Sequence, residues 1–347
     1  MTETRLEQEL REQPAALARL LERQHANAAE LGALFRRDDV NYLLVASRGS
    51  SSNAARYAQY LLGRASRVPV AFATPSLYTL YEQPPRLDGA LVIGISQSGE
   101  SPDVRAVIDE ARRQGRPTIA ITNTPDSPIG NAAEAVLPLE AGEERAVAAT
   151  KTYVNSLGAI ALLFASSTRD AEALRQLGLM PDRIEAQLRQ TFEDAAALEG
   201  FAGIHGGTVV TRGINYCTCY EIALKIRELS GLLFEAYSAA DLMHGPVAAI
   251  KPGWPVIAVA PSGPALESIE AAIRDLAGRG ARIMAISDRD DVLSLAAAPL
   301  RLVPGVPEWL SPFTTVVPGQ LAALRLAQLN GSDVDHPHGL SKITLTL

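Results

Sequence analysis

Residues 91–102 combine a short apolar run with a cluster of hydroxyl side chains. The run Leu91–Ile95 predicts a buried parallel strand, and the sequence Ser-Gln-Ser-Gly-Glu-Ser-Pro follows it directly. Pro102 predicts the first turn of a helix, with Ser101 as its N-cap. Loop amides, hydroxyls and a helix N-terminus all favour an anion, so the pattern favours a phosphate site. A serine-rich, well-capped loop without a ligand is the alternative interpretation.

Two known kinds of nucleotide loop do not fit these residues. The loop contains no lysine, which excludes a Walker P-loop. The spacing G-x-G-x-x-G is also absent from the sequence, which disfavours a dinucleotide site.

A second set of residues could carry acid–base chemistry. Residues 216–231 predict a helix on which Glu221, Lys225 and Glu228 share one face. A polar and aromatic segment follows and ends at His244, directly before a Gly-Pro pair. Rows of this kind are often solvated, salt-bridged helix faces, and that interpretation stays open. A histidine near a carboxylate-bearing helix is nevertheless a candidate for proton transfer.

The elements that must position these residues alternate between strands and helices. The first 35 residues predict helical structure, with Pro14 separating two helices. The hydroxyl-rich segment 47–53 is predicted as a loop. The strands are expected at 41–46, 68–72, 91–95, 118–122 and 135–139, and the helices at 54–62, 76–81, 102–115 and 151–166. This alternation predicts a parallel, doubly wound sheet.

The second half of the chain repeats the first. Ser47-Arg48-Gly49 is matched by Thr211-Arg212-Gly213, and Ser98-Gly99 is matched by Ser262-Gly263. We therefore expect two copies of one α/β domain. The serine cluster is present only in the first copy. The expected divisions are N-terminal helices at 1–36, a first domain at 37–168, a helical linker at 169–200, a second domain at 201–330 and a C-terminal tail at 331–347.

Composition restricts the partners of the chain. The net charge of −7 gives no basic surplus for nonspecific binding of nucleic acid. The longest apolar run is too short to span a bilayer, and because charged residues begin at Glu3 we expect no signal peptide. Two cysteines, Cys217 and Cys219, fit ordinary buried side chains in a reducing compartment. We expect a cytoplasmic globular protein without a metal cluster, a membrane partner or a nucleic-acid partner.

Three motifs, in order along the chain, resemble those of the sugar isomerase (SIS) domain family. They are residues 95–101, the helix motif from Glu221 to Glu228 with His244-Gly-Pro, and the tail segment His338-Gly-Leu-Ser-Lys. The similarity covers nearly the whole chain and is greatest to the isomerase half of glucosamine-6-phosphate synthases and their shorter relatives. The resemblance implies two doubly wound SIS domains and a sugar phosphate as substrate.

The resemblance also implies a role for each matching residue. Glu228 would move a proton between C1 and C2 of the sugar, Lys225 would assist it, and His244 would open the sugar ring. Lys342 would close over the site, where a Schiff base to the open-chain carbonyl is one option. His244 would come from the partner subunit of a homodimer, and no cofactor is implied. The implied substrate-binding residues are Ser50, Ser51, Ser96, Gln97, Ser98, Ser101, Val147 (through its backbone) and Ser341.

The direction of the reaction depends on the source of nitrogen. The sequence begins at Met1-Thr2-Glu3 and has no cysteine before Cys217, so we expect no glutaminase activity. This favours deamination of glucosamine-6-phosphate to fructose-6-phosphate and ammonia. One alternative is a deglycase that acts on phosphorylated fructosyl-amines. Another, of a different class, is a sugar-phosphate sensor without catalysis, although a sensor would not need the four catalytic residues together.

Overall fold

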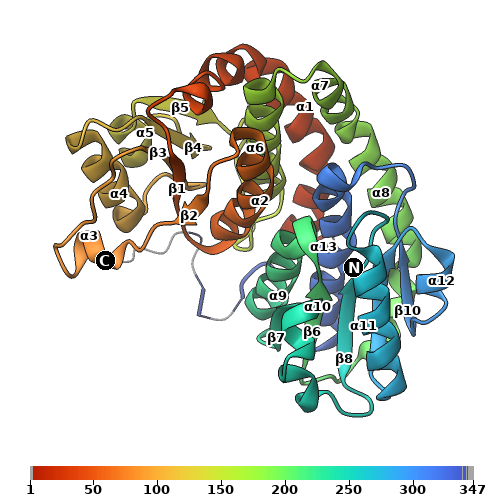
Figure 1. Cartoon of the computed structure of the whole chain (residues 1–347). Helices are drawn as coiled ribbons and strands as arrows, with labels where there is room; N and C mark the ends of the chain where they lie inside the picture. Colours follow the sequence, from red (N-terminus) through yellow and green to blue (C-terminus); the bar gives the residue numbers. More distant parts are fainter. Residues whose placement is uncertain (1–2, 338, 341, 343–347) are drawn as a thin grey trace. The chain divides into compact units, whose positions relative to one another are not determined.

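The computed structural model describes residues 3–337, 339–340 and 342. It divides into two compact units, and each unit draws on separate parts of the sequence. Unit 1 contains residues 1–11, 146–150 and 182–340, and unit 2 contains residues 12–145, 151–181 and 341–347. Among the described residues, each unit holds one five-stranded parallel sheet (Figure 1).

The sheet of unit 2 has the strand order β2-β1-β3-β4-β5. Helices α3, α4 and α5 lie on one face, and α2 and α6 pack on each other along the opposite face (Figure 1). The strands are β1 (Tyr42–Ser47), β2 (Val70–Phe72), β3 (Ala90–Ile95), β4 (Thr118–Thr122) and β5 (Ala135–Pro138). The helices are η1 (Leu34–Arg36), α2 (Gly49–Ser66), α3 (Ser76–Thr79), α4 (Pro102–Arg113), α5 (Pro128–Ala132), α6 (Lys151–Thr168) and α7 (Ala171–Gly178).

The sheet of unit 1 has the order β10-β9-β8-β6-β7, which is the same topology as unit 2 read from the other edge. The strands are β6 (Gly206–Thr211), β7 (Leu233–Ser238), β8 (Pro255–Val259), β9 (Arg282–Ser287) and β10 (Ala298–Arg301). The longer helices are α8 (Met180–Asp194), which starts in unit 2, α9 (Tyr216–Ser230), α11 (Leu266–Gly278) and α13 (Ser311–Leu329). The shorter ones are η2 (Ala195–Phe201), η3 (Gly213–Asn215), α10 (Ala239–Met243), η4 (Pro246–Ala249), α12 (Asp290–Leu293) and η5 (Glu308–Leu310). The repeat predicted from the spacing of motifs is therefore confirmed.

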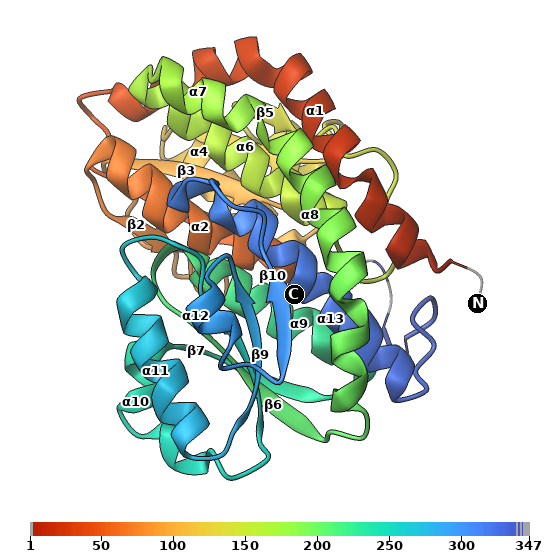
Figure 2. The same cartoon turned by 90° about the vertical axis from the view of Figure 1, so that its right-hand side faces the viewer.

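Alternate residues of the strands of unit 1 face two separate apolar cores. Val210 of β6 packs with Ile269 and Ile273 of α11, whereas the adjacent Val209 packs with Ile222 and Ile226 of α9. Figure 2 shows α11 and α12 on one side of this sheet and α9 and α13 on the other. Because α9 contacts β6 and β7 of the sheet and also packs against α13, polar side chains on these faces of α9 are removed from water.

The N-terminal prediction was wrong in one respect. A single helix, α1 (Arg5–Leu31), runs through Pro14, which was expected to separate two helices. An interior proline removes one hydrogen bond and costs about 3 kcal/mol, so other contacts must compensate for it. The apolar side of α1 supplies them, with four leucines that are at most 1% exposed: Leu6, Leu10, Leu17 and Leu20. Burial of several leucines, each contributing about 1.5–3 kcal/mol, outweighs the missing bond.

Within the part of the chain that the structure describes, no helix combines the length and hydrophobicity that crossing a bilayer requires.

Candidate functional site

The serine-rich loop of unit 2 follows β3 at the carboxyl edge of the sheet. β3 ends at Ile95, and α4 begins at Pro102 with Ser101 in the N-cap position. The Ser101 side chain makes no capping bond and instead lies 3.4 Å from the hydroxyl of Ser96. The predicted strand, loop, helix and N-cap position are therefore confirmed, although the hydroxyl of Ser101 turns toward the loop and makes no capping hydrogen bond.

Backbone groups of the loop orient its hydroxyls. The amide of Gly99 donates to Ser96 Oγ at 3.1 Å, and the amide of Glu100 donates to Ser98 Oγ at 3.2 Å. Each serine oxygen accepts a hydrogen bond from the main chain, so its own proton can be donated, in Ser96 either to Ser101 Oγ or to a ligand. The main chain of Gln97 is fixed, because its backbone carbonyl accepts a hydrogen bond from the backbone amide of Asn123 at 3.1 Å. The arrangement suits a ligand that only accepts hydrogen bonds, such as a phosphate.

Gly99 is required by close packing as well as by its backbone. Its φ is +71°, and a Cβ at this position would lie 1.8 Å from Ser127 Oγ. Gly115, at the end of α4, has a similar φ of +69° but open space around it. Replacing Gly115 by alanine would test the cost of the left-handed backbone alone. Replacing Gly99 by alanine would add the cost of the clash with Ser127.

We expect Gly99→Ala to destabilise unit 2 more than Gly115→Ala does. Both variants should lose about 1–2 kcal/mol for the left-handed backbone. Gly99→Ala should lose about 1–3 kcal/mol more through overpacking against Ser127. Denaturant unfolding of both variants measures the difference, and equal losses would contradict the close contact.

A second hydroxyl cluster lies at the end of the neighbouring strand. β1 and β3 pair in parallel, so their carboxyl ends meet at one edge of the sheet. Ser50 and Ser51 were predicted in a loop, but the structure places them in the first turn of α2, which begins at Gly49. The prediction was wrong because α2 starts as soon as β1 ends. Two helix N-termini thus face the same edge, where the strand order reverses and ligands commonly bind.

An ion pair that the sequence did not reveal ties the two segments together. Arg48 Nε donates to Asp103 Oδ2 at 2.6 Å, and the Asp103 side chain is only 1% exposed. Asp103 also accepts the amide of Val104 at 2.8 Å in the first turn of α4. The pair fixes the start of α2 relative to the start of α4. The repeat offered one signal, because Arg212 occupies the matching position in the second copy.

In unit 1, α9 buries most of its charged row. Lys225 Nζ lies 2.5 Å from Glu228 Oε2 and 3.5 Å from Glu221 Oε1. The side chains of Glu221 and Lys225 are 0% and 1% exposed, whereas that of Glu228 is 26% exposed. A solvated, salt-bridged face, the alternative left open by the sequence, is therefore wrong for Glu221 and Lys225. A buried lysine paired to two carboxylates is costly to build, and it fixes the carboxylate that remains accessible.

Glu228 lines a cavity of about 540 Å³ in unit 1. The last turn of α9 forms one wall, and the tail contributes Ser332, Asp333, His336, Pro337 and Leu340. His336 Nδ1 lies 3.2 Å from Asp333 Oδ2 and lowers the pKa of that carboxyl group, mainly through this hydrogen bond. Glu228 is therefore the member of the α9 row that solutes can reach.

The remaining predicted residues have distinct surroundings. His244 follows α10 directly and is exposed, and it is not among the described residues that line the Glu228 cavity. Val147 is half-buried, and the preceding Ala146 amide donates to both Glu9 oxygens at 3.3 Å. Lys342 Nζ donates to Glu144 Oε2 at 2.7 Å. Ser341, together with His338 of the tail motif, lies outside the described residues.

Among the described residues, no group of three or more histidine, cysteine, aspartate or glutamate side chains could hold a metal ion.

Comparison with known proteins assigns the fold to a family. A sequence model of the SIS domain matches residues 39–166 and 208–329, which together are most of the chain and correspond to its two sheets. The chain belongs to the SIS domain family. The double match agrees with the internal repeat, because each copy of the family domain contains one sheet and the helices around it.

Three proteins illustrate what this chain is similar to. The glutamine–fructose-6-phosphate aminotransferase (isomerizing) of Thermus thermophilus is 33% identical over 96% of this SIS chain and 57% of its own length. The chain thus spans little more than half of that relative. The structure of a candidate phosphosugar isomerase from Silicibacter pomeroyi is 30% identical, has a TM-score of 0.85, and the match covers 96% of this chain and 100% of that chain. The glucosamine-6-phosphate deaminase of Thermotoga maritima shares the fold at 20% identity, with a TM-score of 0.78 over 99% and 100% of the two chains.

Proposed function

We propose that this SIS chain is a phosphosugar aldose–ketose isomerase whose reaction is the deamination of glucosamine-6-phosphate to fructose-6-phosphate and ammonia. The observation that carries the proposal is Glu228, an accessible carboxylate held by the buried ammonium of Lys225 at 2.5 Å. Moving a proton between two adjacent carbons needs one positioned base that gives back what it takes. The named activities of the aminotransferase and deaminase relatives support the substrate class.

The proposed reaction starts from the open-chain aldehyde. Glu228 takes the proton from C2 while the aldehyde oxygen at C1 gains a proton from water, and the product is an enaminol with a double bond between C1 and C2. The same carboxyl group returns its proton to C1, which leaves a protonated imine at C2. Water adds to the imine carbon, ammonia leaves, and the ketone of fructose-6-phosphate remains. Lys225 orients Glu228 and stabilises negative charge that develops nearby.

The other predicted residues have proposed roles in binding and ring opening. Ser96, Ser98 and Gln97 bind the phosphate and the neighbouring hydroxyls. Lys342 closes over the substrate, and His244 opens the ring. The further binding residues proposed are Ser50, Ser51, Ser101, Val147 and Ser341.

A panel of amino-sugar phosphates and fructosyl-amine phosphates tests the substrate. We expect the 347-residue chain to release ammonia and fructose-6-phosphate in equal amounts from glucosamine-6-phosphate, as measured by coupled enzyme assays. Turnover of fructosyl-amine phosphates alone would replace the proposal with a deglycase. Binding without turnover of any member would replace it with a sensor.

We also propose that the working form is a homodimer to which the partner contributes His244. Its exposure, and its separation from the lining of the Glu228 cavity, support a role outside its own subunit. Mixing inactive Glu228→Gln with inactive His244→Ala should then restore part of the activity, because mixed dimers contain one site with both residues intact. Absence of recovery despite measured subunit exchange would contradict the shared site.

A further inference from the structure

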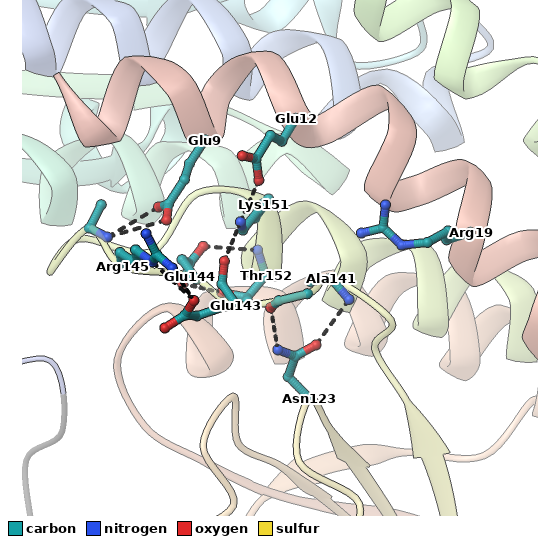
Figure 3. A network of polar contacts seen from close by, with 12 residues as sticks. Glu9, Glu12, Arg19, Asn123, Ala141, Glu143, Glu144, Arg145, Lys151 and Thr152 are labelled. Atoms are coloured by element: carbon teal, nitrogen blue, oxygen red, sulfur yellow. Dashed lines mark hydrogen bonds and ion pairs between the residues drawn. The ribbon is translucent and has the colours of Figure 1, made fainter. Parts of the chain in front are cut away.

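Glu144 is a buried carboxylate to which the proposed mechanism gives no role. Its side chain is 0% exposed, although it lies in a segment that the sequence marked only as polar. Two hydrogen bonds from the start of α6 fix it, because the Thr152 amide donates to Oε1 at 3.1 Å and Thr152 Oγ1 donates to Oε2 at 2.7 Å (Figure 3). A buried carboxylate with both oxygens engaged by one residue has little freedom to move.

The oxygen that accepts the Thr152 hydroxyl also accepts the tail lysine. Lys342 Nζ donates to Glu144 Oε2 at 2.7 Å, and the lysine side chain is 25% exposed. The pair joins two positions 198 residues apart within unit 2. A lysine side chain is long and flexible, and it loses much conformational freedom when its amine is held. Because Glu144 is itself fixed, the ion pair restricts the Lys342 amine to one position.

The other lysine near this carboxylate is bound in a different way. Lys151, one residue before Thr152, donates to Glu12 Oε2 and to the Glu143 carbonyl (Figure 3). The Glu143 side chain points elsewhere, since it is 71% exposed and pairs with Arg145 at 2.7 Å. Glu143 and Glu144 are adjacent, but only the Glu144 side chain is buried. Among the described contacts, only Glu144 pairs with Lys342.

We propose that Glu144 is a positioning residue that holds the Lys342 amine at a fixed place through the Thr152-braced carboxylate. The role of Lys342 in turnover rests on the proposed function, whereas the anchoring of its amine does not. Glu144 acts through Lys342 and has no contact of its own with the substrate in this proposal.

Amine labelling tests the anchor without any substrate. The sequence contains four lysines, Lys151, Lys225, Lys251 and Lys342, of which Lys251 is exposed and serves as the internal reference. Acylation under limiting reagent, read by mass spectrometry, should show Lys342 reacting more slowly than Lys251. Glu144→Gln should raise the Lys342 rate about fivefold, the factor for an ion pair worth about 1 kcal/mol. Glu143→Gln is the matched control and should leave the Lys342 rate unchanged.

Two further readouts protect the test against loss of folding. Thr152→Val keeps the shape but removes the hydroxyl brace, and it should raise labelling of Lys342 by a smaller factor. The rise must be confined to Lys342. An equal rise at buried Lys225, or an unchanged Lys342 rate in both variants, would overturn the proposal.

Kinetics separate this proposal from the proposed function. If the chain turns over a sugar phosphate, Glu144→Gln should lower kcat more than it changes KM, and it should have no further effect in a Lys342→Met background. An equal loss of kcat in both backgrounds would overturn positioning through Lys342. If no substrate is turned over, the proposed function fails, while the labelling result still decides the anchor.

Discussion

Replacing Glu228 by glutamine is expected to lower kcat by about 10²–10⁴-fold while KM changes little. Glutamine keeps the size of the side chain and an oxygen that can accept from Lys225, but it cannot take a proton from carbon. The variant should therefore fold and bind substrate normally. Steady-state kinetics with glucosamine-6-phosphate measure the effect.

Glu270→Gln is a suitable control for that variant. Glu270 is also a helix glutamate in unit 1, its side chain is 24% exposed, and it pairs with Arg274 at 2.6 Å. Its replacement should leave kcat unchanged. Wild-type enzyme in heavy water should place deuterium at C1 of the ketose, and Glu228→Gln should lose this activity together with turnover. Near-normal turnover by Glu228→Gln would mean that the α9 row is only structural.

Replacing both Ser96 and Ser98 by alanine is expected to raise KM for a sugar phosphate by about 10²-fold or more. Each hydrogen bond to a charged group is worth about 1.5–3 kcal/mol, and the double variant removes two. Ser96 also accepts the Gly99 amide, so part of the effect should come from a less ordered loop. Substrate titrations of initial rate measure the change.

The second copy of the domain provides the control for the serine variants. Ser262 occupies the position that matches Ser98 but lies in a loop without the serine cluster. Ser262→Ala should leave KM near that of the wild type. The double variant should also discriminate less between phosphorylated and unphosphorylated sugars. An unchanged KM would remove the loop from the substrate site.

The sequence predicted the elements whose local signals agree with their burial. The strand at 118–122 was predicted with its observed bounds, because five consecutive residues are fully buried and most carry β-branched side chains. Pro14 misled the prediction, since a proline is a strong local signal that burial of the leucines of α1 overrides. The position of Ser50 and Ser51 was misjudged for a similar reason, as nothing local marks where α2 begins.

The proposed site was predicted less completely than the fold. The row on α9 was visible from its spacing, but spacing cannot tell a buried row from a solvated one. The surroundings of α9 depend on tertiary packing, since α13, which packs against it, lies almost one hundred residues later in the chain. Glu144 and Asp103 were missed because their partners, Lys342 and Arg48, are distant in sequence. Long-range ion pairs leave no periodic pattern that a single sequence could reveal.

The division of α1 between the two units has a consequence for how the chain folds during synthesis. Unit 2 has all but its last seven residues available once Pro181 has been made, so it can fold early on the ribosome. Unit 1 includes residues 1–11 at its start but cannot be completed before Leu340. Residues 1–11 therefore find their partners in unit 1 only after most of the protein has been made. The rest of α1 belongs to unit 2 and can pack there earlier. Slow translation after Pro181 would give unit 2 time to fold first. The part of α1 in unit 2 would then be helical before the rest of unit 1, which contacts the start of α1, has been made.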